Sequence, residues 1–170
     1  DISGTPNNVT GTTQTTVYTI TPTSSIGCVG NDFTASVTVT PEPVGVATPA
    51  TQTVCSDVAI TTISLTTSNS LTGTTFAWTR DNTANITVLA NSGSGDISGT
   101  PNNVTGTTQT TVYTITPTSS IGCIGNDFTA SVTVTPEPVG VATPATQTVC
   151  SDVAITTIAL TTSNSLTGTT

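Results

Sequence analysis

The residues most able to do chemistry are four cysteines in two recurring settings. Cys28 and Cys123 follow an Ile-Gly pair in a turn, whereas Cys55 and Cys150 follow Thr-Val and precede Ser-Asp. Zinc usually requires closely spaced Cys-x-x-Cys pairs or histidines, and the sequence has neither. An even number of cysteines at fixed places in a threonine-rich chain without lysine instead predicts an extracellular disulfide framework.

Other chemistry has few residues to use. The chain has no histidine and one basic residue, Arg80, so neither a Ser-His-Asp triad nor a Schiff base can be built. The acids come singly at turns, as at Asp32, Asp57 and Asp96, where turn geometry favours them without a catalytic or calcium-binding role. We therefore expect no enzyme activity, no metal and no cofactor.

The net charge of −8 argues against two classes of partner. Nucleic-acid binding requires clustered lysine and arginine, and anionic membrane surfaces attract the same residues. No window of the sequence has the apolar length of a membrane span. We expect neither nucleic-acid binding nor membrane insertion.

The chain is a tandem repeat. Residues 1–75 recur as residues 96–170, a period of 95 residues. The copies differ only at the pairs Val29/Ile124 and Ser64/Ala159. A unit of this length is a whole domain and not a solenoid turn.

Two Pro-Glu-Pro segments, at residues 41–43 and 136–138, mark the predicted domain boundaries. Two prolines around one residue remove backbone donors and favour a stiff, extended connector. The predicted domains are the C-terminal part of a repeat (1–40), one complete repeat (41–135) and the N-terminal part of the next (136–170). Because the chain begins and ends within a repeat, we expect it to be a stretch of something longer. Further copies would complete the partial domains, along one polypeptide or by strand addition between molecules.

The complete repeat is typical of a series of short strands. The alternation is clearest at Phe33–Val39, which has one apolar and one hydroxylated face. Further strands are predicted at Thr15–Thr21, Val44–Val54 (interrupted by Pro49), Val58–Thr67 (with a bulge), Thr75–Thr79 and Asn85–Ala90. The segment Asn91–Asp96 is predicted to be the loosest loop. This pattern predicts an all-β fold of tandem immunoglobulin-like antiparallel β-sandwich repeats, although cysteines in turns depart from the immunoglobulin hallmark.

The aromatic residues are predicted to lie in the core. The single tryptophan shares a strand face with Phe76, which favours a core position over an exposed sugar-binding platform. The residues expected in the core are Tyr18, Phe33, Val37, Val39, Ile63, Leu65, Trp78, Tyr113, Ile115 and Phe128.

Two disulfide pairings are compatible with this organisation. A Cys55–Cys123 bond would make each repeat self-contained and would stabilise it by about 4 kcal/mol on the chain-entropy model. The alternative joins Cys28 to Cys55 and Cys123 to Cys150, across each Pro-Glu-Pro segment, and would lock successive repeats together. Turn cysteines at opposite poles of a sandwich would be too far apart to bond, so the sequence leaves both pairings open.

Three segments carry a family resemblance: the Cys-Ser turn after Gln52, the Phe-Ala-Trp strand at Phe76, and the Gly-Cys turn at Cys28 and its copy Cys123. The chain resembles the PKD-like and immunoglobulin-like repeats of very large Bacteroidota surface proteins, which include gliding-motility adhesins and other cargo of the type IX secretion system. The resemblance covers the complete repeat and both partial ones. It implies an extracellular segment at the bacterial cell surface and carries over no catalytic residue.

Two classes of function follow. The first is a structural repeat of an extracellular stalk or filament that provides length and stiffness. The second is an adhesive module that binds a glycan or protein through loops such as Asn91–Asp96. Near-identity of the copies favours the first, because a spacer needs repetition and a ligand site does not.

Overall fold

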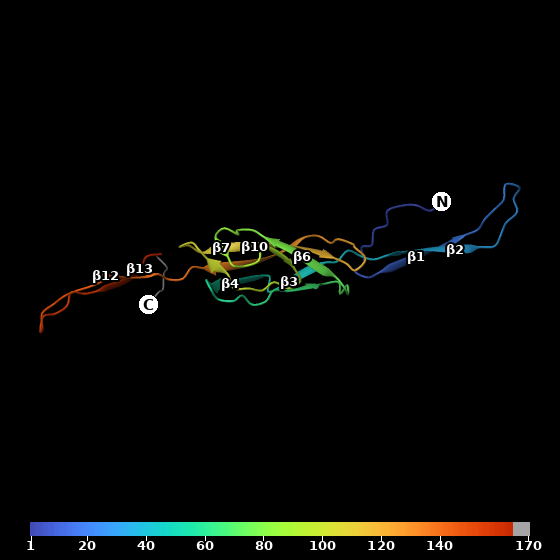
Figure 1. Ribbon diagram of the computed structural model, residues 1–170. Coiled ribbons are helices and arrows are strands. Elements are labelled where there is room, and N and C mark those ends of the chain that lie inside the picture. The colour runs from blue at the N-terminus through green and yellow to red at the C-terminus, as the bar shows by residue number, and fades with distance from the viewer. Residues whose placement is uncertain (165–170) are drawn as a thin grey trace.

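The structure is a computed structural model that describes residues 1–164. Within that range the regular elements are all β-strands, as the abundance of threonine and valine predicts, because β-branched side chains pack well on pleated surfaces. A sandwich lies at the centre of an elongated molecule, with a two-stranded hairpin on either side of it (Figure 1). None of the described residues belongs to a helix long and apolar enough to cross a membrane.

The central sandwich contains the strands of one complete repeat. These are β3 (Gly45–Thr48), β4 (Thr51–Cys55), β5 (Ser64–Thr67), β6 (Thr75–Arg80), β7 (Ile86–Thr87), β8 (Ser92–Ser94), β9 (Asn102–Asn103), β10 (Gln109–Thr118) and β11 (Phe128–Thr135). The N-terminal hairpin consists of β1 (Gln14–Ile20) and β2 (Phe33–Val39), and the C-terminal hairpin of β12 (Gly140–Thr143) and β13 (Ala159–Thr162).

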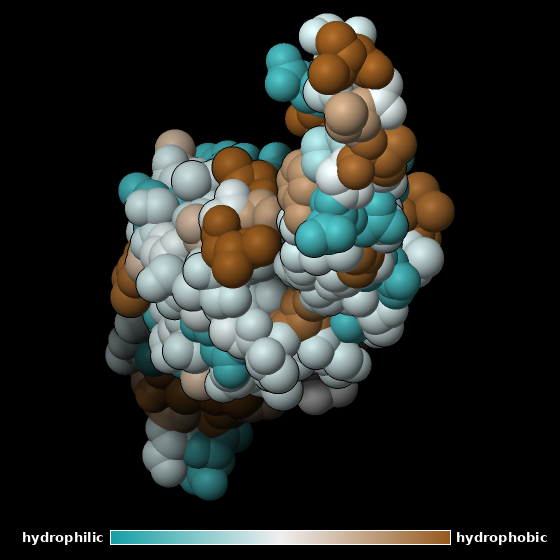
Figure 2. All heavy atoms as spheres, turned by 90° about the vertical axis from the view of Figure 1, so that its right-hand side faces the viewer, coloured by the Kyte–Doolittle hydropathy of each residue, from teal (hydrophilic) through white to brown (hydrophobic). Residues whose placement is uncertain are grey.

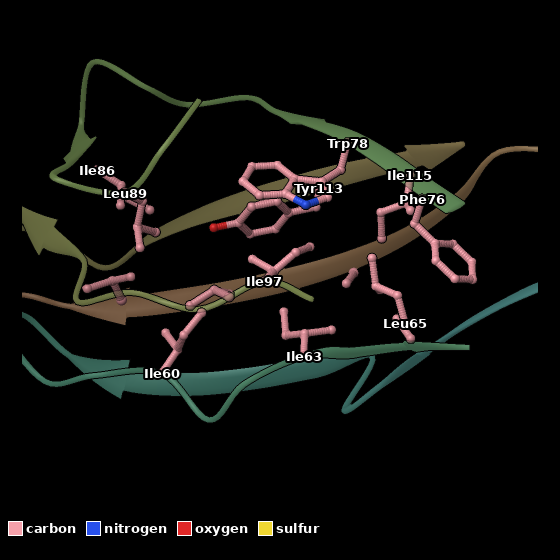
Figure 3. Packing of buried hydrophobic residues seen from close by; sticks show 14 residues of the cluster. Ile60, Ile63, Leu65, Phe76, Trp78, Ile86, Leu89, Ile97, Tyr113 and Ile115 are labelled. Carbon is pink, nitrogen blue, oxygen red and sulfur yellow. The ribbon is translucent and has the colours of Figure 1, made fainter. Parts of the chain in front are cut away.

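One face of the sandwich is a five-stranded sheet in the order β4-β11-β10-β6-β8. Its pairs are antiparallel except for β4, which runs parallel to β11. The two-stranded sheet of β3 and β5 lies across the core from it, and β7 pairs with β9 in a short ribbon (Figure 3). The all-β sandwich predicted from the sequence is thus confirmed.

The core lies between these sheets and is organised by two edge-to-face aromatic pairs. The ring centroids of Trp78 and Tyr113 are 5.5 Å apart (Figure 3). Those of Phe76 and Phe128 are 6.1 Å apart. The buried apolar residues around them are Ala47, Ile60, Ile63, Leu65, Ile86, Leu89, Ile97, Ile115, Ala130, Val132 and Val134. The buried apolar cluster is therefore confined to the complete repeat.

Four residues expected in the core lie elsewhere. Phe33, Val37 and Tyr18 in the N-terminal hairpin are exposed, and Val39 is only half-buried. The physical reason is that β1 and β2 pair only with each other, and no facing sheet covers them. Alternation identifies a face that can be buried, and the copies Tyr113, Val132 and Val134 are buried where a facing sheet is present.

Several strand predictions also need correction. The predicted strand at Val44–Val54 is two strands, β3 and β4, which belong to different sheets and separate at Pro49. Only Ser64–Thr67 of the predicted strand at Val58–Thr67 and only Ile86–Thr87 of that at Asn85–Ala90 are strands. The predicted third domain extends to residue 170, and its residues 165–170 lie outside the described part of the chain.

Candidate functional site at the joints between repeats

All four cysteines are free thiols, and the fold separates them along the molecule. Cys55 ends β4 at the pole of the sandwich where β11 leaves for the second joint, whereas Cys123 lies in the β10–β11 loop at the opposite pole. Cys28 lies in the loop of the N-terminal hairpin and Cys150 in that of the C-terminal hairpin, on either side of the sandwich (Figure 1). The members of each predicted pair therefore lie at different ends of the sandwich, or one in the sandwich and one in a flanking hairpin, in this structure.

The first joint, at the Pro-Glu-Pro segment 41–43, is fixed by two asparagines. The Asn8 amide donates hydrogen bonds to the carbonyl oxygens of Thr12 (2.8 Å) and Val39 (2.7 Å). From the other side of the joint, the Asn69 amide donates to the Glu42 carbonyl oxygen at 2.8 Å, and its Oδ1 accepts the Val44 N–H at 3.2 Å. Asn8 thus binds the end of β2, and Asn69 binds the connector's backbone, where proline supplies no donor.

The second joint, at residues 136–138, repeats these contacts with copies of the same residues. The Asn103 amide donates to the carbonyl oxygens of Thr107 and Val134, both at 2.8 Å. Asn164 donates to the Glu137 carbonyl oxygen at 2.5 Å and accepts the Val139 N–H at 3.3 Å. One set of interactions therefore fixes both connectors.

A close approach of glycine and asparagine recurs at both joints. A Cβ placed on Gly11 would lie 3.8 Å from the Asn69 Cβ, and one placed on Gly106 would lie 3.7 Å from the Asn164 Cβ. Each contact brings together residues from the two sides of a joint. The similar separations show that consecutive repeats meet in the same way twice.

Each joint encloses a hollow, and the two hollows share most of their lining. The first, of about 700 Å³, is lined by residues 7–9 and 40–42 and by Asn69, with Cys123 and Ile124 on the side of the sandwich. The second, of about 410 Å³, is lined by the copies of these connector residues, residues 102–104, 136–137 and Asn164. There the sandwich contributes Ser56 and Asp57 instead. The sandwich thus presents a different end to each joint.

The loop proposed from the sequence as adhesive, Asn91–Asp96, is tied to the sandwich. Its Ser92–Ser94 form β8, which pairs with β6, and the Trp78 Nε1 donates to the Gly95 carbonyl oxygen at 2.9 Å. The Asp96 carboxylate accepts the Leu65 N–H at 2.8 Å. Gly93 is needed here, because a Cβ would collide with the Trp78 ring. The predicted loosest loop is therefore an edge strand.

The one basic side chain is buried and has a structural role. The Arg80 guanidinium donates to the carbonyl oxygens of Leu89 (2.9 Å) and Ala90 (3.0 Å) and to the Asn91 Oδ1 (3.0 Å). It thereby holds the chain between β6 and β8. Burial raises the pKa of the neighbouring Tyr113, and the positive charge of Arg80 partly offsets that rise.

No catalytic constellation is found in the described part of the chain. Residues 1–164 contain no group of three or more histidine, cysteine, aspartate or glutamate side chains that could hold a metal ion. Asp32 and its copy Asp127 each accept a hydrogen bond from a threonine hydroxyl, Thr21 and Thr116 respectively, at 2.5 Å. The acids therefore serve local structure, and the joints are the feature that the two repeats share in detail.

Seen from the end that bears the N-terminal hairpin, the surface shows apolar residues on the projecting hairpin as well as scattered over the sandwich (Figure 2). The large apolar residues exposed on this hairpin are Val17, Tyr18, Ile26, Val29, Phe33 and Val37. Tyr18, Phe33 and Val37 share one face of the hairpin, whereas Val17 lies on the opposite face and Ile26 and Val29 lie in the loop. The copies of the first three, Tyr113, Phe128 and Val132, belong to or pack against the core of the complete repeat.

The chain matches a known protein family. A family model described as a PKD-like domain matches residues 1–43 and 52–138, which is more than half of the chain. The match includes the N-terminal hairpin, the first joint and nearly all of the sandwich. No curated protein matches the chain.

Proposed function

Because the chain belongs to the PKD-like domain family, which in general suggests an extracellular structural or adhesive module, we propose that it is a stiff spacer: a structural repeat of a stalk or filament. We place it on a bacterial cell surface, as the resemblance to Bacteroidota surface repeats and type IX secretion cargo suggests. Its partners are further copies of the same repeat. No catalytic role is part of the proposal.

The observation that carries this proposal is the repetition of the joint. Asn8 and Asn103 bind the end of one repeat, and Asn69 and Asn164 bind the connector from the next, with matching partners. A connector whose two ends are hydrogen-bonded, and whose φ angle is fixed at two prolines, can adopt few conformations and is therefore stiff. When the same stiff joint recurs between all repeats, the array bends little and forms a rod.

The adhesive alternative has one supporting feature. β8 is the outer strand of the five-stranded sheet, and its residues Ser92–Ser94 are exposed, so a peptide could add to this edge. Exposed aromatic rings for glycan stacking are few in the sandwich, where Trp78, Tyr113 and Phe76 are buried. The spacer is therefore the better-supported function.

Electron microscopy of arrays with increasing numbers of the repeat tests the proposal. A spacer predicts that end-to-end length grows in proportion to copy number, with little bending at the joints. A matched array in which both Pro-Glu-Pro segments are replaced by Gly-Ser-Gly should be shorter end to end and visibly bent. Equal bending in the two arrays would contradict the proposal. Binding of the unaltered chain to a glycan or surface protein, lost on substitution of Ser92–Ser94, would favour the adhesive alternative.

A further inference from the structure

Each sandwich presents a different cysteine at each of its poles. Cys55 is the last residue of β4, and its neighbour in the parallel ladder is Thr135, which directly precedes the second joint. Cys123 lines the hollow of the first joint. A repeat therefore presents one cysteine toward the repeat that follows it and another toward the repeat that precedes it.

The identity of the two joints shows where these cysteines would meet. Thr40 lines the first hollow together with Cys123, and Thr40 is the copy of Thr135 one period earlier. Thr135 pairs with Cys55, and paired strands lie about 4.7–4.9 Å apart. At a joint between two complete repeats, the threonine equivalent to Thr135 therefore has two relevant neighbours. The Cys55 of its own repeat pairs with it, and the Cys123 equivalent of the following repeat lines the same hollow. Disulfides require Cα atoms about 4.4–6.8 Å apart, so the two cysteines must approach each other across this shared hollow to bond.

The prolines of the two joints support this placement. Pro43 is fully buried, and Gly125 of the β10–β11 loop lies so close that a Cβ would collide with the Pro43 carbonyl oxygen. Pro138, its copy, is exposed. The loop that carries Cys123 is thus the element that covers this proline, and the equivalent loop of a following repeat would cover Pro138, three residues from Thr135.

We propose that each joint between complete repeats is a disulfide site, in which Cys55 of one repeat bonds to the cysteine equivalent to Cys123 in the repeat that follows. The proposal rests on the spacer function in one respect: repeats must follow one another through the joint seen here. This pairing differs from both pairings considered from the sequence, because it joins adjacent repeats through cysteines 163 residues apart, one full period beyond the 68-residue interval from Cys55 to Cys123.

The bond forms by thiol–disulfide exchange with a small-molecule disulfide as the oxidant. One cysteine thiolate attacks the oxidant, releases one thiol and forms a mixed disulfide. The second cysteine thiolate then attacks the protein sulfur of the mixed disulfide and releases the second thiol. Two protein thiols are oxidised, one small-molecule disulfide is reduced to two thiols, and the two thiol protons pass to those products.

The chain itself provides the first test. We expect no disulfide within the 170-residue chain after incubation with oxidised glutathione, because neither joint contains both cysteines. After alkylation of free thiols and denaturation, trypsin cuts the unreduced chain at its one basic residue, Arg80. Residues 1–80 and 81–170 should then separate without reductant, whereas a Cys55–Cys123 bond would keep them joined and overturn the proposal.

A chain extended at its C-terminus by a further copy of residues 76–170 provides the second test. It contains two complete repeats in register, and trypsin divides it into three fragments. The proposal predicts that the first and last fragments stay joined without reductant while the middle one, which carries Cys123 and Cys150, is released. Bonds within repeats would join all three fragments, and bonds between Cys28 and Cys55 or between Cys123 and Cys150 would release all three. Either result would contradict the proposal.

Matched variants of the extended chain complete the design. Cys55→Ser should release all three fragments, whereas Cys28→Ser should leave the outer two joined. Circular dichroism under reducing conditions shows that each variant is folded before oxidation. If the disulfide is absent but arrays still image as straight rods, the pairing is wrong and the spacer function stands. If the disulfide forms but the arrays bend freely after reduction, the pairing stands and the claim that non-covalent contacts alone stiffen the joint is wrong.

Discussion

The N-terminal hairpin and the β10–β11 hairpin share a sequence but not an environment. Residues 14–39 and 109–134 differ only at Val29/Ile124, and their strands pair in the same register, Gln14 with Val39 and Gln109 with Val134. Tyr18 is 37% exposed, whereas its copy Tyr113 is 1% exposed. Val37 is 40% exposed and its copy Val132 is fully buried.

The difference separates what is local in this fold from what is not. The hairpin and its register are local, because the same residues produce them with and without neighbours. Burial is non-local and requires β4 and β6 on either side and the β3–β5 sheet opposite. β10 has ten residues and its copy β1 has seven. The three additional residues, Thr116–Thr118, are in a strand because they pair with β6, and β1 has no such neighbour.

The sharpest test of this contrast is a matched pair of tyrosine substitutions. Tyr113→Ala should lower the free energy of unfolding by about 3–5 kcal/mol, the cost of removing a buried aromatic ring. Tyr18→Ala should change it by less than about 1 kcal/mol, as surface substitutions do. Urea denaturation followed by Trp78 fluorescence measures both. Equal losses would show that the two hairpins share one environment.

Removing the buried cation of β6 should have the next largest effect. Arg80→Met leaves the carbonyl oxygens of Leu89 and Ala90 without their charged donor and should cost about 2–4 kcal/mol. Thr79→Ala, an exposed neighbour on the same strand, is the control and should stay within about 0.5 kcal/mol. An Arg80→Met variant with an unchanged free energy of unfolding would contradict the structural role assigned to the Arg80 side chain.

Replacing Asn103 should lower the free energy of unfolding more than replacing its copy Asn8, because Asn103 lies in the more buried environment. Asn103→Ala leaves the buried Val134 carbonyl oxygen without its side-chain donor and should cost about 1–3 kcal/mol in urea denaturation. Asn8→Ala removes the matching bond to the Val39 carbonyl oxygen where it is less buried, so the loss should be smaller. An Asn8→Ala loss equal to or above that of Asn103→Ala would overturn the ranking.

The smallest expected effect depends on pH. Burial holds the pKa of Tyr113 above its usual value of 10.0, so the unfolded chain releases this proton at lower pH than the folded chain. The stability from this group is complete below pH 10 and is lost as pH rises from 10 through the raised pKa. Tyr113→Phe should make the sandwich less sensitive to alkali, while Tyr18→Phe serves as the control. Denaturation midpoints from pH 8 to 11 provide the measurement, and an unchanged alkaline slope in Tyr113→Phe would be the contrary result.

Local patterns predicted the strands with clear alternation, and they predicted short strands and long-range relations less well. The alternation at Phe33–Val39 matches the bounds of β2, because period-2 hydrophobicity reflects the pleat itself. Pro49 signalled an interruption but not that the chain changes sheets there. Ser92–Ser94, with a glycine and no apolar side chain, carried no strand signal, and only the Trp78 ring beside Gly93 explains why the chain is extended.

The joint was predictable in part. The Pro-Glu-Pro segments indicated a stiff connector, but the sequence did not indicate that Asn8 and Asn69 hold it. Recurrence could not single them out, since residues 1–75 recur one period later at all but two positions. The cysteine positions were not predictable, because the pole on which Cys55 lies depends on β4 running parallel to β11.

The central claim is that every joint sets the same step between repeats, and the native cysteines can measure it directly. Cys28 and Cys123 are one period apart, as are Cys55 and Cys150, and all four are free thiols. One variant keeps the first pair, with Cys55→Ser and Cys150→Ser, and a second keeps the other pair, with Cys28→Ser and Cys123→Ser. Spin labels on each pair allow the distance across one joint to be measured by double electron–electron resonance. A narrow distribution is predicted for each joint, whereas a broad distribution in either variant would contradict a rigid joint that recurs.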